Sequence, residues 1–268
     1  MVDFVCKSQY NADDFRRIIE LLRAPGGCPW DIEQTHESIR RNLLEEAYEV
    51  CEAIDDKDPD HLKEELGDLM MQVLFHSRIE EEKGVFSLDD VADAAVKKLI
   101  FRHPHVFGDV SVSSSSEVLV NWDELKRKEK AQSTVTKAMT DVAESLPALW
   151  RAEKIQKKAH KVGFDWPTVI GVEEKLKEEM TELSEALASG DKNSITEELG
   201  DLIFTAVNIA RFAGVDPEQA LHQSCDKFIG RFDYIERAAA EKGKELSSMT
   251  LEELDELYEL GKEAGSCK

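Results

Sequence analysis

The sequence predicts an all-α protein made of two tandem helical domains, each built around the same acidic helix pair. Apolar residues recur at the helical spacing of i, i+4 and i+7 through most of the chain. Short runs rich in β-branched residues, which would indicate strands, are scarce. The letters EELGDL occur at 64–69 and again at 197–202. Together these patterns indicate helix bundles and an internal duplication.

The helices of the repeated pair are predicted from their apolar positions and their ends. The apolar positions are Leu43, Leu44, Ala47, Val50 and Ile54 in the first repeat, and Ile195, Leu199, Leu202, Ile203 and Ala206 in the second. Asp58-Pro59 ends one helix and starts the next, because proline disfavours a continuing helix. Asp216-Pro217 opens another helix, and Thr250-Leu-Glu-Glu253 is a capping box.

A break in the helical pattern divides the chain, whose 268 residues suit two domains. The serine run Ser113–Ser116 ends the first block, and the polar stretch Lys126–Thr140 leads to the second. We therefore expect a first domain at 1–125, a partly helical linker at 126–149 and a second domain at 150–268.

The charge and the cysteines limit the partners that we expect. Asp and Glu number 56 against 34 Lys and Arg, and the net charge of −22 repels nucleic-acid backbones and anionic membranes. No stretch approaches the roughly 18 apolar residues of a membrane span. The five cysteines form no C-x-x-C pair, and the charged N-terminal stretch does not resemble a signal peptide. We expect a reduced, cytoplasmic protein that binds no nucleic-acid polymer and no membrane.

The repeat extends well beyond six letters. Residues 42–75 align without a gap on 175–208, and 19 positions separate the matched glutamates in both halves. Each half also carries a glycine, Gly67 or Gly200, where a helix interior is predicted. A glycine there costs about 1 kcal/mol relative to alanine, so we expect another helix or a ligand to approach it closely.

Each repeat places four acids where they can meet. Positions i and i+3 share one face of a helix, so two E-x-x-E or E-x-x-D pairs on adjacent helices face each other. The quartets are Glu46, Glu49, Glu65 and Asp68, and Glu179, Glu182, Glu198 and Asp201. Four carboxylates in a partly buried groove need cations, and an all-oxygen set favours Mg²⁺ or Mn²⁺ over zinc. Solvated acids on exposed faces are the alternative, which the double recurrence disfavours.

A cationic pair follows each acidic quartet. KKLIFR at 97–102 matches DKFIGR at 226–231, and the pairs are Lys98 with Arg102 and Lys227 with Arg231. Each pair shares a helical face at i, i+4, where it could form surface salt bridges. Beside a metal-loaded acidic groove, however, such a pair suits a polyphosphate such as a nucleoside triphosphate.

The four tryptophans divide into two groups. Trp30 and Trp166 lie next to an aspartate before the acidic helices of their halves, which leaves a core position and a ligand contact equally open. For Trp122 and Trp150 we expect core positions.

These motifs, with CPWD at 28–31 and RHPHVF at 102–107, resemble the MazG family of nucleoside triphosphate pyrophosphohydrolases. The resemblance runs from about Ala24 to Tyr258. It implies helix pairs that dimerise into bundles, and Mg²⁺-dependent cleavage of nucleoside triphosphates, deoxynucleotides included, to a monophosphate and pyrophosphate. We expect water to attack the α-phosphorus, with no covalent intermediate.

The resemblance also assigns roles to residues. The second quartet would hold the metal, and Lys175, Glu178, Lys227 and Arg231 would line the nucleotide site. Tyr258 stands where better-known members have Trp, which indicates base stacking. Glu178, or Glu45 in the first domain, is the candidate general base. We expect the second domain to hold the main site.

Two further expectations concern assembly and alternatives. Two-helix units that leave an apolar face uncovered should pair, so we expect a homodimer or a larger homo-oligomer. A ferritin-like di-iron site is disfavoured because E-x-x-H occurs only from Glu33 to His36, outside the repeated helices. The remaining alternative is a non-catalytic helical regulator that binds a nucleotide or a partner protein.

Overall fold

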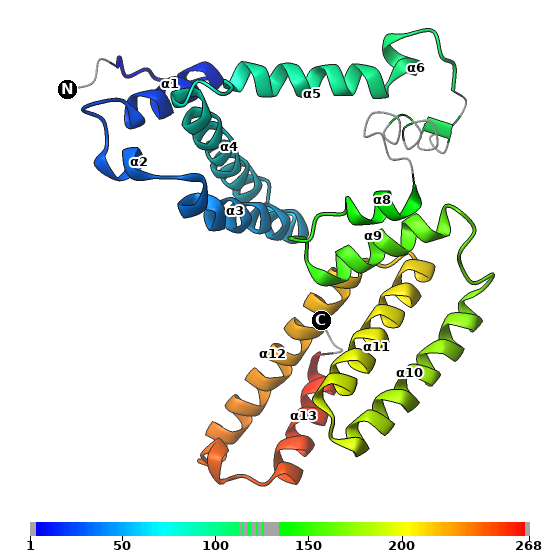
Figure 1. The fold of residues 1–268 in the computed structure, drawn as a ribbon. Coiled ribbons are helices and arrows are strands. Elements are labelled where there is room, and N and C mark those ends of the chain that lie inside the picture. The colour runs from blue at the N-terminus through cyan, green and yellow to red at the C-terminus, as the bar shows by residue number, and fades with distance from the viewer. Residues whose placement is uncertain are drawn as a thin grey trace. The chain divides into compact units, whose positions relative to one another are not determined.

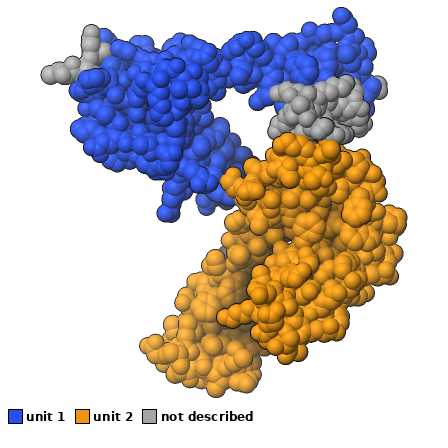
Figure 2. Space-filling model, viewed as in Figure 1, with its two compact units in different colours: residues 1–126 blue, residues 127–268 orange. Residues whose placement is uncertain are grey.

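The computed structural model describes residues 4–112, 114, 117, 118, 122, 125 and 134–265. Every regular element among these residues is a helix, which confirms the predicted all-α class (Figure 1). The chain separates into two compact units, Met1–Lys126 and Arg127–Lys268 (Figure 2). Most of the expected break, including Ser113, Ser115, Ser116 and 126–133, lies outside the described residues. None of the described helices is both long and apolar enough to cross a membrane.

The first unit is organised around one long helix pair. Its described helices are α1 (Ala12–Arg23), α2 (Pro29–Glu33), α3 (His36–Asp56), α4 (Pro59–Glu82), α5 (Leu88–Arg102) and α6 (Pro104–Phe107). Helices α3 and α4 pack against each other, and α1 packs on α4. Helix α5 begins near the end of α4 and runs away from the α3–α4 pair (Figure 1).

The second unit repeats the long pair and adds a C-terminal helix. Its described elements are α8 (Val135–Thr140), α9 (Ala148–His160), α10 (Val169–Ser189), α11 (Lys192–Ala213), α12 (Pro217–Glu241), a 3₁₀ turn (Leu246–Ser248) and α13 (Leu251–Gly265). Helices α10 and α11 form the pair, and α13 packs along α12 (Figure 1). The expected linker contains α8, which packs on α9.

The turn inside each long pair has the same geometry in both halves. Asp58 accepts hydrogen bonds from the backbone N–H groups two and three residues later, at 3.0 and 3.1 Å, and Asp191 does the same at 3.4 and 3.2 Å. The preceding residue adopts the left-handed conformation, Lys57 at φ 57° and Gly190 at φ 72°. The predicted boundary at Asp58-Pro59 is therefore confirmed.

The other two predicted helix starts are also confirmed. The carboxylate of Asp216 accepts a hydrogen bond from the backbone N–H of Gln219 at 3.0 Å, which caps α12. Thr250 and Glu253 form the reciprocal bonds of a capping box at 3.1 and 3.3 Å before α13.

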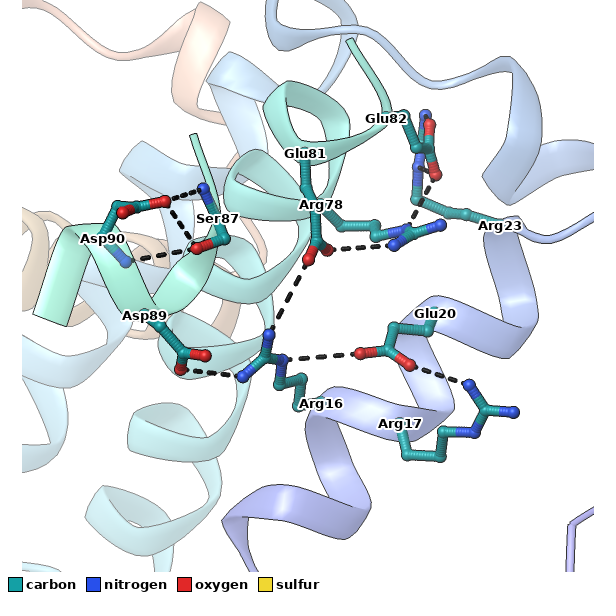
Figure 3. Close-up of polar contacts among 10 residues, drawn as sticks. All are labelled: Arg16, Arg17, Glu20, Arg23, Arg78, Glu81, Glu82, Ser87, Asp89 and Asp90. Atoms are coloured by element: carbon teal, nitrogen blue, oxygen red, sulfur yellow. Dashed lines mark hydrogen bonds and ion pairs between the residues drawn. The ribbon is translucent and has the colours of Figure 1, made fainter. Parts of the chain in front are cut away.

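A buried core and a polar network fix α1 and α5 to α4 in the first unit. The core is Ile19, Ile39, Leu74, Phe75 and Ile79. Arg16 donates to Asp89 at 2.8 Å and lies 3.7 Å from Glu81, so one guanidinium links α1, α4 and α5 (Figure 3). Arg23 is buried, pairs with Glu82 at 2.9 Å and donates to two backbone carbonyls in and just after α2.

In the second unit, charged and polar contacts join the ends of the helices. Arg211 on α11 donates to both carboxylate oxygens of Asp165, at 2.6 and 2.8 Å, and His160 lies 2.7 Å from the same carboxylate. Trp150 donates its indole N–H to Asp216 at 2.9 Å, which ties α9 to the start of α12. These contacts hold the ends of the long pair that carries the acids.

Candidate active site

The structure brings together three acids of each predicted quartet. Glu46 and Glu49 lie one turn apart on α3, and α4 places Glu65 opposite them. In each of the two groups, Glu46, Glu49 and Glu65, and Glu179, Glu182 and Glu198, carboxylate oxygens of the three members lie within 4.8 Å of one another. The fourth acids, Asp68 and Asp201, lie outside these tight groups. We call the two groups the first and the second carboxylate cluster.

In each cluster, the surroundings disfavour the charged form of one glutamate. Burial raises the pKa of Glu46 above its usual value, and the charges of Asp68 and Glu49 raise it further. In the second cluster, burial and the charge of Glu182 raise the pKa of Glu198. Each cluster is therefore a place where a cation would relieve repulsion between carboxylates.

The two halves place different basic side chains beside their most buried acid. Glu65 is 8% exposed, and His61 Nε2 lies 3.1 Å from its carboxylate. Glu179 is 4% exposed, and Lys175 Nζ lies 2.8 Å from it. Asn42 holds the position of Lys175 in the first half. His61 is a site neighbour that the sequence motifs did not single out, although its i, i+4 spacing from Glu65 is visible in the sequence.

The candidate bases lie beside the clusters and already have cationic partners. Glu178 accepts a hydrogen bond from Lys175 at 2.7 Å, and Glu45 accepts one from Arg41 at 2.7 Å. The hydrogen bonds to Glu178 and Glu179 raise the pKa of Lys175 above its usual range. Lys175 thus spans a cluster acid and the candidate base next to it.

The two cationic pairs are placed differently from Lys175. In the part of the chain that the structure describes, no ion pair joins Lys98, Lys227 or Arg231 to either cluster. The guanidinium of Arg231 instead lies over the ring of Tyr258, 5.3 Å from its centroid. Similarly, the guanidinium of Arg102 lies 5.5 Å from the ring centroid of Trp122.

The structure also shows the surroundings of the four tryptophans and of the two glycines in the repeated helices. Trp30 and Trp166 are 61% and 40% exposed, so neither is a core residue. Trp122 and Trp150, expected in the core, are only half-buried; the Trp122 ring contacts the guanidinium of Arg102, and the Trp150 indole N–H donates to Asp216. A Cβ added at Gly67 or at Gly200 would meet no atom within 4 Å. The close approach expected at these glycines is therefore not made by the described part of this chain.

The donor set fits a hard divalent cation. Each cluster offers three carboxylates and no nitrogen or sulfur ligand within the tight group. Burial raises the pKa values of Glu46 and Glu198, and neighbouring carboxylates raise them further; a bound cation would remove that repulsion. An all-carboxylate set of this kind suits Mg²⁺ or Mn²⁺.

Comparison with known proteins agrees with this architecture. The family model described as "MazG nucleotide pyrophosphohydrolase domain" matches residues 34–107 and 168–235, one match in each half. The chain is 44% identical to the "Nucleoside triphosphate pyrophosphohydrolase/pyrophosphatase MazG" of Thermotoga maritima, over 91% of this chain and 93% of that one. It is 44% identical to a nucleoside triphosphate pyrophosphohydrolase of Escherichia coli K12, over 92% and 95%. It is also 48% identical to the uncharacterised Bacillus subtilis YabN, over 93% of this chain and 51% of YabN.

Two tandem helical units, each with an acidic helix pair, thus define the chain as a duplicated α-helical protein of the nucleotide pyrophosphohydrolase class. The chain belongs to the MazG family. This confirms the resemblance seen in the sequence.

Proposed function

We propose that this protein is a Mg²⁺-dependent nucleoside triphosphate pyrophosphohydrolase that converts nucleoside and deoxynucleoside triphosphates into a monophosphate and pyrophosphate. The observation that carries the proposal is the carboxylate cluster, which recurs at matched positions in both halves of a MazG-family chain. Mn²⁺ is expected to substitute for Mg²⁺, because both are hard cations that prefer oxygen ligands.

The residues of the second unit can be given definite roles. Glu179, Glu182 and Glu198, with Asp201 nearby, would hold Mg²⁺, which supplies charge neutralisation and a more acidic bound water. Glu178 would accept a proton from the attacking water. The oxygen of that water joins the α-phosphorus, and the bond to the bridging oxygen of pyrophosphate breaks. Lys227 and Arg231 would balance the negative charge of the phosphates.

Lys175 is proposed to change its partner when the metal ion and the nucleotide bind. Its ammonium group now lies within 2.8 Å of both Glu178 and Glu179. When Mg²⁺ takes over the charge of Glu179, Lys175 is free to turn to a phosphate oxygen. Because Asn42 cannot replace it in the first half, the second unit is the better candidate for the main site.

We also propose that the protein is a homodimer or a larger homo-oligomer built through like units. Helix α4 exposes Leu66, Met70 and Val73 by 37–49%, and these residues follow one helical stripe. Helix α11 exposes Leu199 and Ile203 at the matched positions, by 44% and 46%. The open space at the neighbouring glycines would allow a second copy to approach. Light scattering at micromolar concentration tests this, and a monomeric mass would contradict it.

Pyrophosphate release is the test of the activity. We expect release from ATP, GTP and deoxynucleotides with Mg²⁺, recovery with Mn²⁺, and none in EDTA. Nucleotide binding without turnover in Mg²⁺ would instead identify a regulator. The expectations of a cytoplasmic location and of no binding to nucleic-acid polymers or membranes remain predictions.

A further inference from the structure

Both halves place an aromatic ring against the arginine of the repeated cationic pair. Tyr258 lies against Arg231, and Trp122 lies against Arg102, with 5.3 and 5.5 Å between guanidinium carbon and ring centroid. The two aromatic residues differ in type and lie outside the segments that align between the halves. Two aromatic residues at unmatched sequence positions therefore make the same contact with the two matched arginines. This recurrence indicates that the contact has a role in holding the arginine side chain.

In the second unit, a hydrogen bond accompanies the contact between the guanidinium and the aromatic ring. Arg231 Nη1 donates a hydrogen bond to the hydroxyl of Tyr258 at 3.2 Å. Phe228 lies against the same ring with 6.0 Å between centroids, and Lys262 Nζ lies 5.4 Å from the centroid. The ring of Tyr258 thus has neighbours from both α12 and α13 before any nucleotide arrives.

Close packing between α12 and α13 fixes where Tyr258 stands. Leu257, the residue before it, is 3% exposed. A Cβ added at Gly261 would lie 3.4 Å from the side chain of Tyr234, at ordinary van der Waals contact, so α12 and α13 run close together at this point. Tyr258 follows this buried residue on α13, and its hydroxyl lies within hydrogen-bond distance of Arg231 on α12.

We propose that Tyr258 is a positioning residue, which holds the guanidinium of Arg231 in the orientation that receives the triphosphate. This inference rests on the proposed function and replaces the base-stacking role expected for Tyr258. A guanidinium has five N–H donors, and the hydroxyl uses one of them, so several remain for phosphate oxygens. Holding a long side chain in place before binding lowers the entropy that binding must remove. The effect should therefore be the same for every base.

Binding of α,β-methylene-ATP and α,β-methylene-CTP in Mg²⁺, measured by calorimetry, tests the proposal. Their methylene bridge occupies the bond that the proposed reaction would break, so no turnover interferes. Tyr258→Phe keeps the ring and removes the hydrogen bond. We expect it to weaken both analogues by the same factor, about 5-fold, the change that follows from losing one hydrogen bond. Unchanged affinities, or a change for the purine analogue alone, would overturn the proposal.

Two further variants make the assignment specific. Adding Tyr258→Phe to Arg231→Ala should cause no further loss, because the hydroxyl then has no arginine to hold, and additive losses would overturn the proposal. Tyr234→Phe removes the hydroxyl of a different tyrosine, whose side chain contacts α13 near Gly261, and should leave both affinities unchanged. If the wild-type protein binds the analogues but does not hydrolyse ATP, the proposed function fails while this test still stands. Failure to bind either analogue would contradict both.

Discussion

Lys175 lies 2.8 Å from Glu179, the most buried acid of the second cluster, and places a positive charge beside it. A buried carboxylate without a partner is unfavourable, so the metal-free protein depends on this lysine. Binding of Mg²⁺ would release the lysine rather than add to it.

The first prediction is that Lys175→Met lowers the melting temperature in EDTA by about 2–4 °C, the shift that 1 kcal/mol gives in a domain of this size. The rise in melting temperature on adding Mg²⁺ should be larger than in the wild-type protein, because the ion then relieves an uncompensated charge. Lys177→Met, which changes an exposed lysine on the same helix, is the control. An unchanged response to Mg²⁺ would show that Lys175 is not the counter-charge.

The second prediction concerns metal binding itself. A cation that binds only the folded state stabilises it, by about 2.7 kcal/mol at a hundred times its Kd. Mg²⁺ or Mn²⁺ should therefore raise the melting temperature, and nucleotide should raise it further. Glu198→Gln should weaken this rise. Glu253→Gln, which changes a helix-capping acid paired with Lys244, should lower the starting temperature but keep the rise. Equal metal responses in the two variants would favour solvated acids over a metal site.

The third prediction separates the two halves. Glu49 and Glu182 hold the same place in the repeat, and glutamine removes the charge of each with little change in volume. We expect Glu182→Gln to lower kcat on ATP or GTP by about 10²-fold or more, on the order of 3 kcal/mol, because it loses a ligand interaction that strengthens in the transition state. Glu49→Gln should keep most of the turnover. The reverse result would move the main site to the first unit, and no effect in either would exclude the carboxylate mechanism.

The fourth prediction is a pH dependence at Asp165. Burial alone would raise the pKa of Asp165, but hydrogen bonds from Arg211 and His160 outweigh it and hold the pKa below the usual value. A lowered carboxylate pKa contributes stability that is present above the ordinary value of 3.8 and is lost as the pH falls through the folded-state value. Asp165→Asn should therefore be less stable at pH 7, on the order of 3 kcal/mol for breaking a buried pair.

Denaturant unfolding at several pH values measures this difference. The gap between Asp165→Asn and the wild-type protein should narrow below pH 3.8 and close once the pH has fallen through the lower folded-state pKa, where the native wild-type carboxyl group is uncharged. Asp233→Asn is a matched control, because Asp233 pairs with Arg237 in an exposed salt bridge on α12. A gap that stays constant down to the lowest pH would show that Asp165 contributes through packing and not through charge.

The sequence predicted those features that depend on local signals. The boundary at Asp58-Pro59 and the capping box at Thr250 depend on residues a few positions apart, and both are confirmed. The meeting of Glu46, Glu49 and Glu65 was predictable because helical periodicity and a short turn together fix which faces oppose.

Contacts between distant segments were not predictable in this way. Arg211 reaches Asp165 and Arg231 reaches Tyr258 across 46 and 27 positions, and no periodic pattern links such pairs. The expected close approach at Gly67 rested on helix propensity alone, which cannot say whether the neighbour comes from the same chain, another chain or a ligand.

The shared turn at Lys57 and Gly190 has a consequence for how this chain can change in evolution. Exposed turns are where proteins ordinarily tolerate insertions and deletions. Here a single left-handed residue and a capping aspartate join the two helices, so an added residue taken up as helix would shift the acids beyond it by about 1.5 Å and rotate them by about 100°, which would separate the two pairs. Substitution is tolerated, since a lysine holds the left-handed position in one half and a glycine in the other. Selection should therefore act on the length of this turn far more strongly than on its composition.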